Sequence, residues 1–183
     1  MRILPIDEIN NLKAKYQSKG ADTPITDFEI TDIIDDLLDI FLLAVANGTI
    51  SINDKFGTDY RPTATQIEKM IYEKVDGASW EDRIRTWYEN GGTAADIIRI
   101  AETESHRIGN ETAYEAAKAV GAKRKIWLTM LDDKVRDTHV YLESVSVGIN
   151  DDFYTYDSDH APYPGAFGKA ENNVGCRCEI QYS

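Results

Sequence analysis

Residues 94–130 read AADIIRIAETESHRIGNETAYEAAKAVGAKRKIWLTM, and the periodicity of the chain changes within this stretch. Thr93 and Asp96 are spaced as a capping box, which predicts a helix that runs until just before Gly121. Beyond that glycine, apolar and polar residues alternate over 123–130 as they do in a strand. The change from a helical to a β pattern predicts an α+β fold.

Upstream of this stretch, apolar residues recur with a helical period and turn-forming residues separate the segments. The strongest segment starts at Thr26 or Asp27, and Asn47-Gly48 is expected to stop it. The polar residues 49–62 are expected to form a loop or a small hairpin. The predicted helices lie at residues 5–19, 27–46, 65–75 and 79–89.

The sequence Asn90-Gly91-Gly92 interrupts the helical pattern and marks a predicted boundary. Residues 1–92 are expected to form a helical region, and residues 93–183 a small α+β module with a short antiparallel sheet. Within the module, residues 145–149 and 153–156 flank the turn-forming sequence NDD and predict a hairpin. The alternating residues at the end of the chain predict a last strand.

The composition is that of a folded, acidic protein. The 183 residues carry a net charge of −12, which disfavours extensive binding to nucleic acid or to anionic lipid. Residues 1–60 hold 5 basic and 11 acidic residues and so contribute half of this charge. The longest apolar run, residues 40–46, is far shorter than the roughly 20 residues of a membrane span. Residues 1–10 lack the apolar stretch of a secretion signal, so we expect a cytoplasmic product.

Trp80 and Trp87 fall on one stripe of the predicted helix at 79–89. Tryptophans at this spacing are most often core residues. They are also candidates for binding a partner protein, because buried tryptophans dominate many interfaces. The sequence leaves both interpretations open.

Asp132, Arg136 and His139 stand at positions i, i+4 and i+7 of a helix expected from Asp132 to about Glu143. On such a helix the three side chains share one face. Arg136 is then placed to hold a carboxylate with two hydrogen bonds, and a neighbouring acid fixes the tautomer of His139. A polar network that joins this helix to the sheet is the favoured interpretation.

His139, Cys176 and Cys178 are candidate zinc ligands, with His160 or Asp132 as a fourth ligand. In an extended strand the two cysteine side chains would stand about 7 Å apart. That separation exceeds the Cβ separation of about 4 Å in a disulfide, so reduced thiols are expected. It also exceeds what a zinc chelate allows unless the backbone bends near Gly175. The alternative is a pair of core thiols.

The sequence has no recognisable catalytic motif. It contains no phosphate-binding G-x-x-x-x-G-K-[ST], no dinucleotide-binding G-x-G-x-x-G and no H-E-x-x-H metalloprotease motif. No elbow motif marks either cysteine as a nucleophile. We therefore predict a protein that is not an enzyme and has no cofactor apart from the candidate zinc.

Several short elements of the second half occur together in one known family. They are Ala101-Glu102-Thr103-Glu104, Arg107-Ile108-Gly109-Asn110, Lys125-Ile126-Trp127, Asp132 to His139, Pro164-Gly165 and Cys176-Arg177-Cys178. In order and spacing they resemble the phage Mu protein F-like minor head proteins, over roughly residues 94–183. Trp80 to Ile84 also resembles an upstream element of these proteins. The signature residues are Glu102, Glu104, Asp132, Arg136, His139, Cys176, Arg177 and Cys178.

The resemblance implies a structural minor component of the head of a tailed phage or prophage. Proteins of this kind associate with the portal during head assembly, and some affect DNA packaging or ejection. The implied partners are the portal protein, the major capsid protein or further copies of the chain. The implied location is the virion, in the capsid interior or at the portal vertex. The acidic residues 1–60 are a candidate for docking on a basic portal surface.

Two other function classes remain as alternatives. One is a metal-assisted enzyme or toxin-like effector carried in the head, with His139, Asp132 and the thiols at its centre. The other is an internal head protein that contacts DNA through the local basic patch Lys123-Arg124-Lys125.

Overall fold

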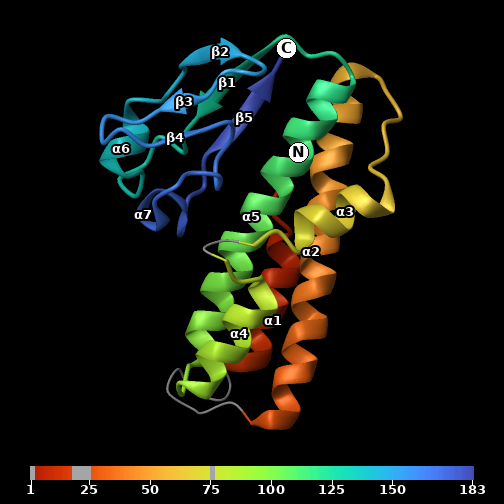
Figure 1. Ribbon diagram of the computed structural model, residues 1–183, viewed down its shortest axis with the longest axis vertical. Coiled ribbons are helices and arrows are strands. Elements are labelled where there is room, and N and C mark those ends of the chain that lie inside the picture. The colour runs from red at the N-terminus through yellow and green to blue at the C-terminus, as the bar shows by residue number, and fades with distance from the viewer. Residues whose placement is uncertain (1–2, 18–25, 75–76) are drawn as a thin grey trace.

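A computed structural model describes residues 3–17, 26–74 and 77–183 of the chain (Figure 1). The helical part contains α1 (Ile6–Gln17), α2 (Asp27–Phe56), α3 (Ala64–Ile71), α4 (Trp80–Glu89) and α5 (Ala94–Ala119). The remainder contains β1 (Arg124–Leu128), α6 (Asp137–Val140), β2 (Ser146–Gly148), β3 (Phe153–Tyr154), β4 (His160–Ala161), α7 (Ala170–Asn173) and β5 (Glu179–Tyr182). The α+β fold class is confirmed. The end predicted near Gly20 lies outside the described residues. The end predicted near Asp76 is wrong, because α3 ends at Ile71 and residues 72–74 are not helical.

The long helices α2 and α5 lie side by side, and the sheet module lies against the C-terminal half of α5 (Figure 1). The N-terminal half of α5 contributes Ile97 and Ile108 to a core shared with α1, α2 and α4. Its C-terminal half contributes Ala113 and Ala117 to the core of the module. The boundary predicted at residue 92 therefore precedes a helix that both cores share.

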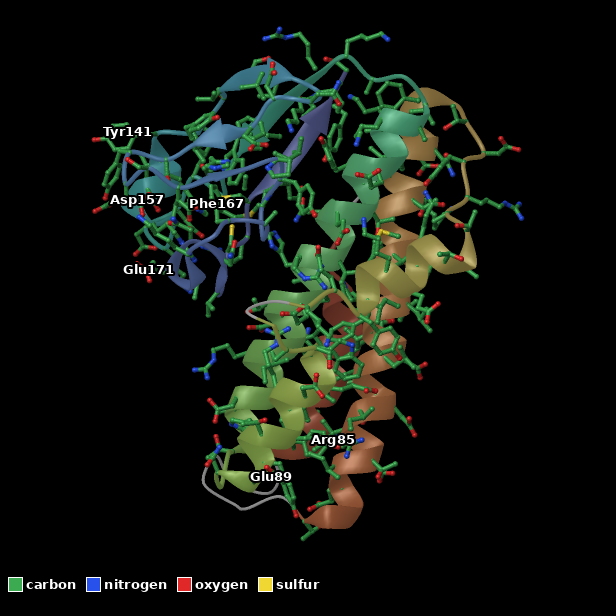
Figure 2. The ribbon with its side chains drawn as sticks, viewed as in Figure 1. Arg85, Glu89, Tyr141, Asp157, Phe167 and Glu171 are labelled. Carbon is green, nitrogen blue, oxygen red and sulfur yellow. The ribbon has the colours of Figure 1, made fainter. Side chains whose placement is uncertain are left out.

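The module holds two small antiparallel sheets. In the first, β1 lies between β2 and β5, with Trp127 opposite Ile180. In the second, β3 pairs with β4. Figure 2 shows Tyr141, Asp157 and Glu171 at the edge of the module away from the helices, with Phe167 further inside.

The predicted hairpin between residues 145–149 and 153–156 is wrong. Ser146 pairs with Ile126 of β1, whereas Phe153 pairs with Ala161 of β4. The Asp151 side chain accepts a hydrogen bond from the Gly148 backbone, which closes a turn after β2. Phe153 packs against Trp127 in the core and pairs with β4 rather than with β2.

The predicted helix stop at Asn47-Gly48 is also wrong, because α2 continues to Phe56 and ends at Gly57, which has a φ of 65°. The loop or hairpin expected over 49–62 is therefore mostly helix. A Cβ atom at Gly48 would lie 2.5 Å from the Gly109 carbonyl oxygen on α5. This glycine permits close approach of two helix backbones rather than ending a helix.

Replacing Gly48 with alanine is expected to lower the free energy of unfolding by about 1–3 kcal/mol. The added methyl group must push α2 and α5 apart, which outweighs the gain of about 1 kcal/mol in helix propensity. Urea unfolding followed by circular dichroism measures the change. The exposed residue Asp54 on the same helix provides the control, since Asp54→Ala should change stability by no more than about 0.5 kcal/mol. A Gly48→Ala protein as stable as the parent would contradict this packing.

The two tryptophans of α4 differ in their surroundings. Trp80 is fully buried and packs edge-on against Phe41 at a centroid separation of 5.1 Å. Trp87 is half-buried, and its Nε1 donates a hydrogen bond of 3.0 Å to Asp96. The structure therefore places Trp80 in the core rather than on a surface that a partner could contact.

Across the described ranges, no helix is long and apolar enough to cross a bilayer.

Candidate functional site

The helix predicted from Asp132 to Glu143 is mostly absent, and only Asp137–Val140 are helical in this segment. Asp132 Oδ1 accepts a hydrogen bond of 3.1 Å from the Lys134 backbone, which stabilises a turn. Arg136 has an extended backbone and precedes α6. The predicted helical stripe of Asp132, Arg136 and His139 is therefore wrong, because the local turn at Asp132 competes with helix formation.

Each of these polar residues nevertheless connects to the C-terminal segment. Asp132 accepts two hydrogen bonds from the Arg177 guanidinium, of 2.7 and 2.8 Å. These hydrogen bonds hold the pKa of the Asp132 carboxyl below its usual range. Arg136 donates to the backbone carbonyls of Glu171 and Val174. Arg136 thus binds backbone carbonyls at the end of α7 rather than the predicted carboxylate, and Asp132 binds Arg177.

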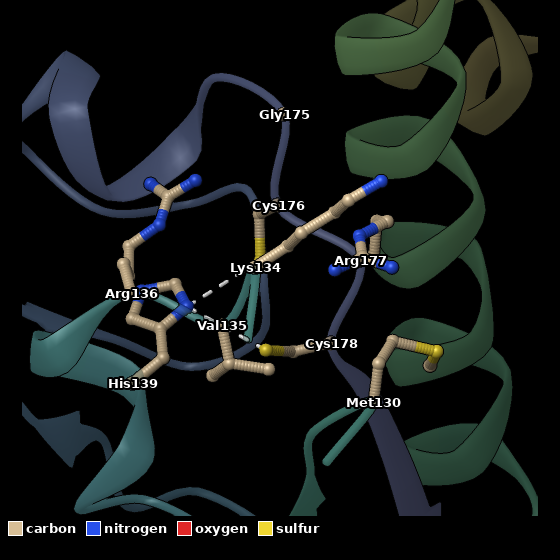
Figure 3. Close-up of a pocket in the computed structure, with 9 residues that line it drawn as sticks. All are labelled: Met130, Lys134, Val135, Arg136, His139, Gly175, Cys176, Arg177 and Cys178. Carbon is tan, nitrogen blue, oxygen red and sulfur yellow. Dashed lines mark hydrogen bonds between the residues drawn. The ribbon is translucent and has the colours of Figure 1, made fainter. Parts of the chain in front are cut away.

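The His139 imidazole faces both cysteine side chains (Figure 3). Its Nδ1 is 3.5 Å from the sulfur of Cys176 and 3.5 Å from the sulfur of Cys178. All three residues are buried. The imidazole packs against Trp127 and Phe167 at centroid separations of 5.3 and 5.2 Å. Its Nε2 has no hydrogen-bond partner in the part of the chain that the structure describes.

The two thiols lie close to each other in a segment that precedes the last strand. Gly175 has a φ of 68°, and strand β5 begins only at Glu179. Cys176 and Cys178 therefore precede the strand in which the sequence pattern had placed them. The candidate ligand atoms of His139 and the two cysteines all lie within 4.8 Å of one another. Both thiols are free.

The two thiols have different proton affinities. A hydrogen bond from the Cys178 thiol lowers the pKa of Cys176 well below its ordinary value. The same hydrogen bond, together with burial, raises the pKa of Cys178. Cys176 is therefore the more acidic of the two thiols.

The two residues considered as a fourth ligand lie elsewhere. His160 Nδ1 is 2.7 Å from the Asp152 carboxylate, and its ring stacks on Tyr154. Asp132 is engaged by Arg177. Neither side chain joins the group formed by His139 and the cysteines, so those two predictions are wrong.

A second group of signature residues lies on α5. Arg107 is buried, and its guanidinium binds Glu104 at 3.0 Å and Glu111 at 2.9 Å. It also donates to the Met70 carbonyl and binds Glu73, and Arg83 binds Glu104 at 2.7 Å. Glu102 is partly exposed and binds Lys13 of α1 at 2.6 Å. The sequence pattern named Arg107 only as part of the element Arg107-Ile108-Gly109-Asn110 and did not name Glu111. Spacings of three and four residues from Glu104 to Glu111 nevertheless place the three side chains on one helical face.

Residues 55–181 match a family model described as phage Mu protein F like protein. The matched range covers more than half of the chain and contains both groups of signature residues. The chain belongs to the phage Mu protein F-like family. Within this Mu F-like protein, one signature group joins α5 to α3 and α4, and the other joins α6 to the segment before β5.

A curated relative is similar over part of the chain. It is named NAD(+)--arginine ADP-ribosyltransferase EFV and comes from Enterococcus faecalis. It is 33% identical over 127 residues, which cover 65% of this chain and 26% of the relative. The Mu F-like chain therefore spans about a quarter of the length of that protein. No solved structure matches the chain.

The network on α5 should make stability depend on pH. Burial raises the pKa of Glu111 to about 7, against the opposing attraction of Arg107. Because the folded chain keeps a proton that the unfolded chain releases near pH 4.5, stability falls as the pH rises from about 4.5 to about 7. Each unit of this pKa shift is worth about 1.4 kcal/mol, so the expected loss is roughly 3 kcal/mol.

Urea unfolding of the parent and of Glu111→Gln at pH 5 and pH 8 measures this effect. The neutral amide cannot ionise, so we expect the variant to lose much less stability between these two pH values. Glu115→Gln, a change of a half-exposed residue on the same helix, should keep the parental pH dependence. Equal pH dependence in the parent and Glu111→Gln would show that Glu111 titrates as an ordinary glutamate.

Proposed function

We propose that this chain is a structural minor head protein of a tailed phage or prophage and that it associates with the portal during head assembly. Membership of the phage Mu protein F-like family over residues 55–181 carries this proposal. A head protein of this kind ends up in the virion, in the capsid interior or at the portal vertex.

The contacts of the signature residues support a structural role. Glu104 and Arg107 bind each other and further residues of α3 and α4. Arg177 binds Asp132, and Arg136 binds backbone carbonyls. Charged groups that are held by internal partners in this way stabilise a particular arrangement of segments. In an enzyme, some of these groups would instead be directed at a substrate.

The acidic face of α2 is our candidate for contact with the portal. Asp32, Asp35 and Asp39 are exposed on this helix, on the side opposite its buried residues. A surface of one charge promotes association with a surface of the opposite charge, and salt weakens such an association. We therefore expect a basic portal surface as the docking site.

Co-expression with the portal protein of the same phage tests this function. Size-exclusion chromatography with a mass measurement should show a stable complex of both chains. The complex should dissociate at lower salt when Asp32, Asp35 and Asp39 are changed to asparagine, and Asp54→Asn provides the control. A separate species of 20.6 kDa, with the portal eluting alone, would contradict portal association.

The curated relative favours one alternative, a toxin-like effector carried in the phage head. That relative is named as an ADP-ribosyltransferase, although this chain spans 26% of it. Incubation of the chain with labelled NAD⁺ and an arginine-containing acceptor protein separates the two functions. We expect no transfer of label, because the family match favours a head protein. Transfer of label above that of a heat-denatured sample would establish the enzyme instead.

A further inference from the structure

The group formed by His139, Cys176 and Cys178 brings together three metal-binding atoms from two distant segments. His139 lies in α6, and the cysteines lie 37 and 39 residues further along the chain. Figure 3 shows the imidazole directed at both cysteine side chains. Imidazole nitrogen and thiolate sulfur are the ligands that zinc prefers in proteins.

The distances fit a tetrahedral ion. Zinc bonds of about 2.3 Å to sulfur and about 2.0–2.1 Å to nitrogen place the nitrogen and sulfur of a tetrahedral site about 3.6 Å apart. Nδ1 of His139 lies 3.5 Å from each sulfur. The two nitrogen–sulfur distances are equal. A cation that is shared by the three atoms accounts for both.

The surrounding contacts hold this arrangement in place. The ion pair with Asp132 keeps the Arg177 side chain away from the group, while the residues on either side of it direct their sulfurs inward. Nε2 of His106 on α5 hydrogen-bonds the Cys178 carbonyl oxygen at 2.8 Å. These contacts hold the C-x-C sequence at Arg177 and Cys178, and a rigid backbone favours metal binding because less ordering is needed on association.

A small cavity adjoins the three side chains. Its volume is about 10 Å³, which suits about one water-sized atom. Residues around the cavity include Met130, Lys134, Val135 and Arg177. A fourth coordination position is thus available beside the buried ligands.

We propose that Nδ1 of His139 and the sulfurs of Cys176 and Cys178 bind one Zn²⁺ ion, with a water molecule in the fourth position. Binding releases the thiol protons, and the resulting pair of thiolates balances the charge of the ion. Zinc that connects α6 to the segment before β5 would stabilise the module. This site does not depend on portal association, so either proposal can fail without the other.

Zinc content is the first test. The chain is purified from zinc-supplemented cells under reducing conditions, desalted, and analysed by inductively coupled plasma mass spectrometry. We expect one zinc per chain in the parent and in the matched control His160→Gln. The content should fall to near zero in Cys178→Ser and His139→Gln. A parent without zinc, or a Cys178→Ser protein with an unchanged content, would overturn the proposal.

X-ray absorption at the zinc edge tests the same site without any variant. The expected shell contains two sulfur atoms at about 2.3 Å and two nitrogen or oxygen atoms at about 2.0–2.1 Å. A shell of nitrogen and oxygen alone would show that zinc binds elsewhere. A mass of the unreduced native protein that is two hydrogens lighter would overturn the proposal by showing a disulfide between the cysteines.

Discussion

Arg107→Ala is expected to lower the free energy of unfolding by about 3–5 kcal/mol. The guanidinium is 5% exposed and binds the buried carboxylates of Glu104 and Glu111. Without Arg107, Glu111 loses its cationic partner and Glu104 keeps only the partly exposed Arg83. Removal of one partner from a buried ion pair costs more than the pair itself contributes, because the remaining charge stays desolvated.

Urea unfolding at neutral pH measures this loss, with Arg85→Ala as the control. Arg85 lies on the exposed side of α4, so its removal should change stability by no more than about 0.5 kcal/mol. At lower pH, the difference in free energy of unfolding between Arg107→Ala and the parent should become smaller, because protonated carboxyl groups need no cation. A difference in stability that stays the same at pH 5 would show that the loss comes from packing and not from charge.

Trp80→Ala should also lower the free energy of unfolding by about 3–5 kcal/mol. Trp80 is completely buried between Phe41 of α2 and Tyr72 beyond α3, so alanine leaves a large cavity. Trp80→Phe keeps an aromatic ring in this position and should lower the free energy of unfolding by a smaller amount. Denaturant unfolding curves measure both changes, and their slopes should stay unchanged.

The same pair of variants separates a core role of Trp80 from a role in partner binding. Under conditions where each variant stays folded, Trp80→Ala should bind the portal protein as tightly as the parent does. Loss of portal binding by a folded Trp80→Ala protein, with little loss of stability, would place the tryptophan in an interface.

The strongest sequence patterns predicted their elements well. The apolar period and the capping residues around Thr93 predicted α5, and alternation predicted β1 at residues 124–128. Each of these elements is determined by a run of neighbouring residues. Gly48 and the segment 145–156 gave wrong predictions because their conformations depend on distant groups. Gly48 contacts Gly109 on another helix, and β2 pairs with β1 rather than with its neighbour in sequence.

The candidate site was predicted only in part for a similar reason. Ligand type alone selected His139, Cys176 and Cys178 from the sequence, and the structure brings these residues together. The expected helical stripe failed because a turn at Asp132 replaces the first turns of the helix. Arg177, which binds Asp132, is 45 residues away, and periodicity carries no information about a contact at that separation.

Neighbouring residues of α5 contact both signature groups of this Mu F-like chain. Arg107 faces α3 and α4, while the adjacent His106 bonds the Cys178 carbonyl next to the candidate zinc ligands. A change in either group should therefore disturb the position of α5 relative to the sheet module.

The presence of the chain in phage particles tests the proposed head function most directly. DNA-filled particles of the phage or induced prophage that encodes it are purified on a density gradient and analysed by quantitative mass spectrometry. We predict that the chain sediments with the particles at a fixed ratio to the portal protein and resists protease until the heads are opened. Particles that contain portal and capsid proteins but lack this chain would contradict its function as a minor head protein.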